Sequence, residues 1–251
     1  MRTVRLMLAA WVWAWTAAGA AGVWETKPFT QWSDKELEKV LTDSPWAGKA
    51  ALTHARAGAG LGSVPDWKIV VALRSALPMK QAFVRSDIGV NGTPTAQHQQ
   101  MLAAEEGLYV VSISGLPRSL GPQLQNVADA ARLTPRGKEG IGATQGSMIM
   151  IDKDGRPIAR VAPGAPQRML VVPVAQRGGG RGGGGGGAIG GGFAAPEDKS
   201  GITATLILGF PKDHPIVADD QEFEFSTVLG AYNLKKTFKL KDMMFMGALA
   251  L

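Results

Sequence analysis

The 251-residue chain contains no cysteine. This absence excludes disulfide bonds, thiolate metal sites and a cysteine nucleophile. It also excludes a lipoprotein anchor, because such an anchor is attached to a cysteine at the cleavage site. Many exported proteins strengthen small cores with disulfides, whereas this fold has to be held by packing and hydrogen bonds alone.

Histidine is scarce, and the common catalytic motifs are missing. The three histidines, His54, His98 and His214, form no HExxH pair. There is no GxSxG nucleophile elbow, no GxxxxGKS/T loop and no GxGxxG set between a strand and a helix. We therefore name no catalytic residue, no cofactor-binding residue and no metal ligand. The alternative is a secreted hydrolase whose Ser-His-Asp set meets only in the fold.

The N-terminus has the three parts of a secretory signal. Arg2 and Arg5 precede an apolar stretch over residues 6–18, and the small residues 18–20 follow it. This order predicts a signal peptide over residues 1–20, and we expect the rest of the chain in the periplasm or outside the cell. An uncleaved anchor is the alternative, because the run 6–24 is just long enough to span a bilayer.

The charge of the chain is mildly positive. The formal net charge is +6, and removal of Arg2 and Arg5 leaves 6 − 2 = +4. This excess is too small to indicate a nucleic-acid partner, and we expect none. The glycine-rich tract at 177–200 holds only two arginines, Arg177 and Arg181, and no aromatic residue interleaves with them, so we expect a flexible loop there.

The pattern of apolar residues predicts an α+β fold. Residues 21–140 mix helices and strands: Ser33 and Glu36 form a capping box that predicts a helix from Asp34, and residues 67–73 alternate as a strand does. Residues 49–66 are expected to form a loop. Residues 141–251 favour an antiparallel, sandwich-like β-rich region, packed with the first region as one unit or as two closely joined ones. Its predicted strands are 147–151, 157–161, 168–175, 202–210, 222–228, 234–240 and 244–249.

Two groups of residues are candidates for partner contacts. Trp32 and Trp46 flank the first predicted helix; we expect both to pack onto the core, with ligand stacking as the alternative. Lys235, Lys236 and Lys239 belong to a basic strand that alternates partly with apolar residues. These lysines protect a sheet edge or, alternatively, bind acidic glycans or lipid headgroups.

Three stretches carry a resemblance to a known group of proteins. Residues 29–46, residues 75–78 (Ser-Ala-Leu-Pro) and residues 235–251, with Phe-Lys-Leu-Lys-Asp-Met near the centre, resemble a group of uncharacterised secreted proteins of soil bacteria. The resemblance covers about a third of the chain, and the glycine-rich tract lies outside it. It implies export and a shared architecture, and it carries no functional residues across.

These observations lead to one expectation about function. We expect an exported, non-catalytic protein that acts by binding or within an envelope assembly. Another envelope protein or an anionic glycan is the expected partner, and a membrane is a partner only if the leader stays uncleaved.

Overall fold

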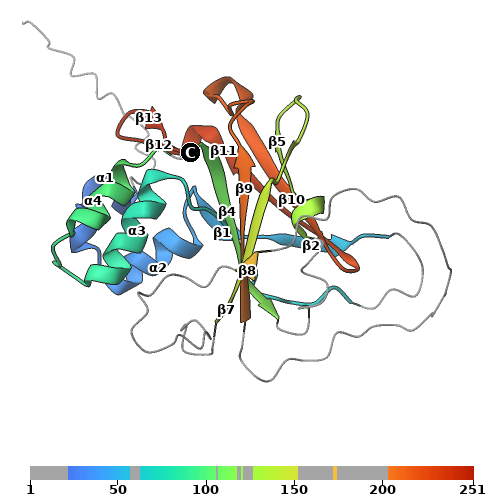
Figure 1. Ribbon diagram of the computed structural model, residues 1–251, viewed down its shortest axis with the longest axis horizontal. Helices are drawn as coiled ribbons and strands as arrows, with labels where there is room; N and C mark the ends of the chain where they lie inside the picture. Colours follow the sequence, from blue (N-terminus) through green and yellow to red (C-terminus); the bar gives the residue numbers. More distant parts are fainter. Residues whose placement is uncertain are drawn as a thin grey trace, which may run out of the picture.

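The computed structural model describes residues 22–56, 63–105, 107–117, 120, 127–151, 172–173 and 203–251. The predicted signal peptide, the glycine-rich loop at 177–200 and the predicted strand at 157–161 lie outside the described residues. Helices and antiparallel sheets occur together, and strands dominate the C-terminal half (Figure 1). The predicted α+β class is therefore confirmed.

The helices within residues 23–103 gather on one side of the sheets (Figure 1). Ser33 begins the main N-terminal helix as predicted, because its hydroxyl accepts from the Glu36 N–H and the Glu36 carboxylate accepts from the Ser33 N–H. This helix buries Leu37 and Val40. The helical elements are α1 (Val23–Thr26), η1 (Phe29–Gln31), α2 (Asp34–Thr42), α3 (Leu77–Ile88), α4 (Ala96–Ala103), α5 (Val127–Ala130), η3 (Ala218–Asp220) and η4 (Leu240–Asp242).

The strands form two larger sheets and one small hairpin, and all pairings are antiparallel. The six-stranded sheet A has the order β1 (Ala47–Lys49), β3 (Val70–Leu73), β4 (Leu108–Pro117), β9 (Thr203–Pro211), β7 (Gln145–Ile151) and β8 (Val172–Pro173). The five-stranded sheet B has the order β2 (Ala51–His54), β11 (Tyr232–Lys239), β10 (Glu222–Leu229), β5 (Arg132–Pro135) and β6 (Ile141–Gly142). The hairpin is β12 (Met244–Phe245) with β13 (Ala248–Leu249).

The chain passes from one sheet to the other at two places. At Ala50 it leaves β1 in sheet A and continues as β2 in sheet B, and at 143–144 it leaves β6 in sheet B and continues as β7 in sheet A. Such strand switches form the corners of packed sheets. Phe210 of sheet A contacts Phe225 of sheet B edge to face, with ring centroids 6.1 Å apart. The two sheets thus enclose one apolar core.

Both halves of the sequence contribute to both sheets. Strands β1, β3 and β4 precede residue 140 and share sheet A with β7 and β9, while β2 and β5 share sheet B with β10 and β11. The buried apolar residues form a single cluster. The described parts of the mixed and the β-rich region therefore pack as one unit.

Two predicted segments need correction. The sequence predicts a loop over residues 49–66, but the last residue of β1 and all of β2 lie there; strands of three and four residues are too short for a period-two pattern to identify them. Residues 244–249 were expected to form one strand, but Met246 and Gly247 have φ of 51° and 81° and turn the chain into a hairpin. Positive φ at both central residues is typical of a type I′ turn.

Candidate functional site

Three chain segments meet at one end of sheet B. They are the turn after β5, the junction of η3 with β10, and the junction of β11 with η4. The Arg136 N–H donates to the Glu222 carbonyl at 3.1 Å, and the Leu240 N–H donates to the Gln221 carbonyl at 2.8 Å. These backbone hydrogen bonds fix the relative positions of the three segments.

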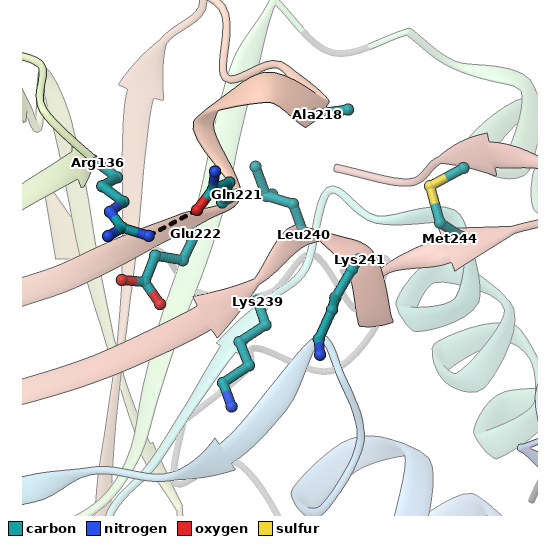
Figure 2. A pocket seen from close by; sticks show the side chains of 8 residues that line it. All are labelled: Arg136, Ala218, Gln221, Glu222, Lys239, Leu240, Lys241 and Met244. Carbon is teal, nitrogen blue, oxygen red and sulfur yellow. Dashed lines mark hydrogen bonds between the residues drawn. The ribbon is translucent and has the colours of Figure 1, made fainter. Parts of the chain in front are cut away.

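An open pocket of about 460 Å³ lies between these segments (Figure 2). Ala218 and Met244 contribute exposed apolar surface, Leu240 lies buried beneath, and the basic side chains of Lys239 and Lys241 extend in the same direction in Figure 2. We call this the sheet B pocket. Its lining residues are Arg136, Ala218, Gln221, Glu222, Lys239, Leu240, Lys241 and Met244.

The charge of the sheet B pocket is positive. Arg136, Lys239 and Lys241 face one carboxylate, Glu222, so the lining carries 3 − 1 = +2. Within the described part of the chain, no ion pair forms at any of the three cations. These cations have no carboxylate partner there, and they lie beside apolar side chains. Such a lining suits a ligand that is anionic and partly apolar.

Gln221 is held in a strained backbone conformation at the edge of this pocket. Its φ is 64° and its ψ is −44°, close to a γ-turn geometry that is rare for any residue with a side chain. Arg136 donates to the Gln221 side-chain oxygen at 2.6 Å (Figure 2). Strain of this kind concentrates at binding and catalytic sites, which supports a functional role for the pocket.

An ion pair between the half-exposed Lys138 and the buried Asp220 lies directly before the strained residue in η3. The Asp220 carboxylate, whose side chain is 4% exposed, lies 2.6 Å from the Lys138 ammonium and accepts from the Val217 N–H at 2.9 Å. Burial raises the pKa of Asp220, but the hydrogen bonds from Lys138 and Val217 and the Lys138 charge outweigh it and lower the pKa below its usual value. Asp220 therefore stays ionised and holds η3 in place.

The two candidate tryptophans lie inside the protein. Trp32 and Trp46 are fully buried, as the packing interpretation predicts. The Trp32 indole donates to the Lys27 carbonyl at 3.0 Å, and the Trp46 ring contacts Trp24 and Phe245 edge to face. From these positions neither ring can stack on a ligand at the surface.

The three candidate lysines do not share one face. Lys235 and Lys239 are exposed on the outer face of β11, where Lys235 pairs with Glu224 at 2.9 Å. Lys236 has the opposite orientation, in phase with the buried Leu234 and Phe238, because side chains alternate with a period of two along a strand. Of the three, only Lys239 lines the sheet B pocket.

Lys236 instead fills the seam between the two sheets. Its ammonium lies over the Phe238 ring at 5.6 Å, and its side chain crosses Gly48 so closely that a Cβ there would lie 2.6 Å from the Nζ atom. Pairing of β11 with β2 ends at Lys235 and Ala51, so the second half of β11 has a free edge at this seam. Lysine side chains along a free edge hinder pairing with another chain.

The histidines of the described chain stand on separate elements. His54 packs against Tyr232 at 5.4 Å. His98 accepts from the Thr95 N–H and bonds Asp87 at 2.8 Å, which places it in a helix cap. His214 is exposed in the segment between β9 and η3. The described residues contain no group of three side chains that could hold a metal ion.

Comparison of the chain with protein-family models, with curated proteins and with solved structures gives no match in any of the three cases. The resemblance of residues 29–46, 75–78 and 235–251 to secreted proteins therefore stays an expectation. Among the helices that the structure describes, none is long and apolar enough to cross a bilayer. The function has to be argued from the sheet B pocket.

Most residues of the pocket were not expected from the sequence. Lys239 stood out as part of a basic strand, but nothing in the sequence connects it with Arg136 or Gln221. Their proximity depends on the pairing of β10 with both β5 and β11. The sequence offers one indication of the pocket, a cation in the turn after one strand and a basic stretch at the end of another strand. This indication can be used only when the order of the strands in the sheet is known.

Proposed function

We propose that this chain is an exported, non-catalytic protein that binds an anionic ligand of the cell envelope in the sheet B pocket. The observation that carries the proposal is the set of three cations, Arg136, Lys239 and Lys241, without an ion-pair partner among the described residues. Phosphate, sulfate or carboxylate groups would replace water around them. The signal peptide predicted over residues 1–20 supports export, and an acidic glycan is the simplest soluble ligand to test.

The rest of the pocket is consistent with binding. Arg136 donates to the exposed Gln221 side chain, a bond that an anionic group can replace at small cost because both partners face solvent. Lys239 lies opposite Glu222 in the β10–β11 register. The Glu222 carboxylate therefore reduces the positive charge of the pocket near Lys239. Ala218 and Met244 are exposed and offer an apolar surface to the uncharged part of a ligand.

The test measures binding of a soluble anionic probe by the processed chain, recovered from the periplasm after export. Mass spectrometry of this chain checks removal of the leader. Titration calorimetry then compares a heparin-derived tetrasaccharide with neutral maltotetraose. We expect binding of the charged probe only, and weaker binding as salt rises, because the cations are exposed.

Variants decide whether the pocket is the binding site. We expect Lys239→Ala with Lys241→Ala to weaken binding by about tenfold, and Glu222→Gln to strengthen it about threefold by removing the one carboxylate. Lys235→Ala is the matched control, since Lys235 lies on the same strand but pairs with Glu224 outside the pocket. Equal binding by the double variant and the parent chain would overturn the proposal.

A further inference from the structure

An exposed apolar tip lies beside the sheet B pocket. Met246 is 86% exposed, more than any other large hydrophobic residue in the part of the chain that the structure describes. It forms the turn of the β12–β13 hairpin, whose first residue, Met244, lines the pocket and is itself exposed. Val217, another exposed apolar residue, precedes the lining residue Ala218.

The position of Met246 is unfavourable for a methionine on two counts. Its φ of 51° is a conformation that type I′ turns assign to asparagine, aspartate or glycine. Its side chain also projects into water instead of covering the core. A polar residue would satisfy both requirements better, so the methionine is best explained by contact with an apolar environment outside the protein.

The tip is firmly attached to the core. Phe245, between the two exposed methionines, is buried against Trp46 with ring centroids 6.4 Å apart. The Trp46 indole donates to the Ala250 carbonyl at 2.8 Å, and the Ala250 N–H donates to the Met243 carbonyl at 3.1 Å. The hairpin therefore presents Met246 at a fixed place relative to the pocket.

Exposed apolar side chains next to unpaired cations are the arrangement by which peripheral proteins bind anionic membranes. We propose that the face formed by Val217, Met244, Met246 and the pocket cations docks on a bilayer containing anionic phospholipid. Met246 enters the boundary between headgroups and acyl chains, while Arg136, Lys239 and Lys241 contact lipid phosphates. The inference rests on the proposed function, because the same three cations bind the ligand, and it names that ligand as a lipid headgroup.

The absence of cysteine from the chain allows a site-specific test. The processed chain carrying Met246→Cys is labelled with an environment-sensitive fluorophore and mixed with vesicles that contain about one third phosphatidylglycerol in phosphatidylcholine. We expect a blue shift and increased emission with these vesicles and no change with pure phosphatidylcholine. Val228→Cys is the control, since Val228 is exposed on the outer face of sheet B, away from the pocket, and its label should not respond.

Vesicle sedimentation with unlabelled variants completes the test. We expect Met246→Ser to weaken vesicle binding roughly tenfold while the heparin-derived tetrasaccharide still binds, and Val228→Ser to change neither. Tetrasaccharide binding without any vesicle binding, or with vesicle binding that Met246→Ser leaves unchanged, would overturn the lipid inference alone. So would a Met246-dependent self-association seen by analytical ultracentrifugation. If neither probe binds, the proposed function fails as well.

Discussion

Trp46 and Ala250 are joined by a hydrogen bond across 204 residues of sequence, from the indole Nε1 to the backbone carbonyl at 2.8 Å. The bond connects the segment before β1 with the last residues of the chain. Because Phe245 packs on the same indole, one buried side chain contacts β12 and the residue that follows β13. The position of the exposed Met246 thus depends on Trp46.

The first prediction concerns this attachment. Trp46→Phe keeps a ring in the core but removes the donor, so the Ala250 carbonyl loses its partner. We expect the free energy of unfolding to fall by about 1–2 kcal/mol and amide hydrogen exchange to accelerate over residues 243–251. Trp32→Phe is the control: it removes the bond to the Lys27 carbonyl and should leave exchange at 243–251 unchanged. Unaltered exchange there in Trp46→Phe would contradict the attachment.

A second prediction concerns the buried guanidinium that joins α2 and α3. Arg85 is 2% exposed, donates from Nε to the Trp32 carbonyl at 2.6 Å and from Nη2 to Asp34 at 3.0 Å. Arg85→Met leaves a buried carbonyl without its donor, and we expect a loss of about 2–4 kcal/mol in urea unfolding.

The matched variant changes the other partner of the same pair. The Asp34 side chain is 90% exposed, so Asp34→Asn should cost less than about 1 kcal/mol. A similar loss in both variants would show that the ion pair, and not the bond to the Trp32 carbonyl, stabilises the contact of α2 with α3.

Local patterns in the sequence predicted the elements but not their assembly. The capping box placed the start of α2 at Asp34, and the alternation of 67–73 identified the buried residues Ile69, Val71 and Leu73 of the β3 segment. Both signals are local, because they involve residues a few positions apart. The same period-two rule puts Lys236 inward, opposite to Lys235 and Lys239, so the three lysines do not form one surface.

The site depends on contacts that no local pattern records. Strands β1 and β2 are too short to give a clear local pattern, and they form because they pair with β3 and β11. The sheet B pocket requires that the turn holding Arg136 lies beside Gln221, 85 residues later. Such long-range proximity follows from strand order, which composition and spacing do not determine.

A third prediction follows from the capping box of α2. The hydrogen bond from Lys27, then those from the Ser33 backbone and hydroxyl, lower the pKa of Glu36 from 4.5 to about 2. A carboxylate whose pKa is lower in the folded state stabilises the fold above its unfolded pKa and loses this effect as pH falls through its folded pKa. The contribution of Glu36 should therefore be complete above about pH 5 and disappear between about pH 4.5 and 2.

Urea unfolding at a series of pH values tests whether the stabilising contribution of Glu36 decreases as the pH falls. The parent chain should exceed Glu36→Gln in stability at neutral pH, and the difference should shrink steadily below about pH 4.5. Glu38→Gln, an exposed substitution on the same helix, should follow the parent chain at every pH. A difference between parent and Glu36→Gln that persists unchanged at the acid end would refute the assignment to this carboxylate.

The last prediction compares two residues with positive φ. Gln221 has φ 64° with ψ −44°, far from the left-handed helical region, whereas Asn91 has φ 56°. Asparagine tolerates positive φ better than other residues with a side chain.

Glycine relieves backbone strain but loses more entropy on folding. We expect Gln221→Gly to stabilise the protein by about 1 kcal/mol, since relief of strain of about 1–3 kcal/mol exceeds the entropy term. Asn91→Gly should destabilise it by about 0.5 kcal/mol, because entropy dominates there. Thermal and urea unfolding of both variants measure whether each glycine raises or lowers the stability of the protein. Destabilisation by Gln221→Gly would mean that Gln221 stores no strain beside the pocket.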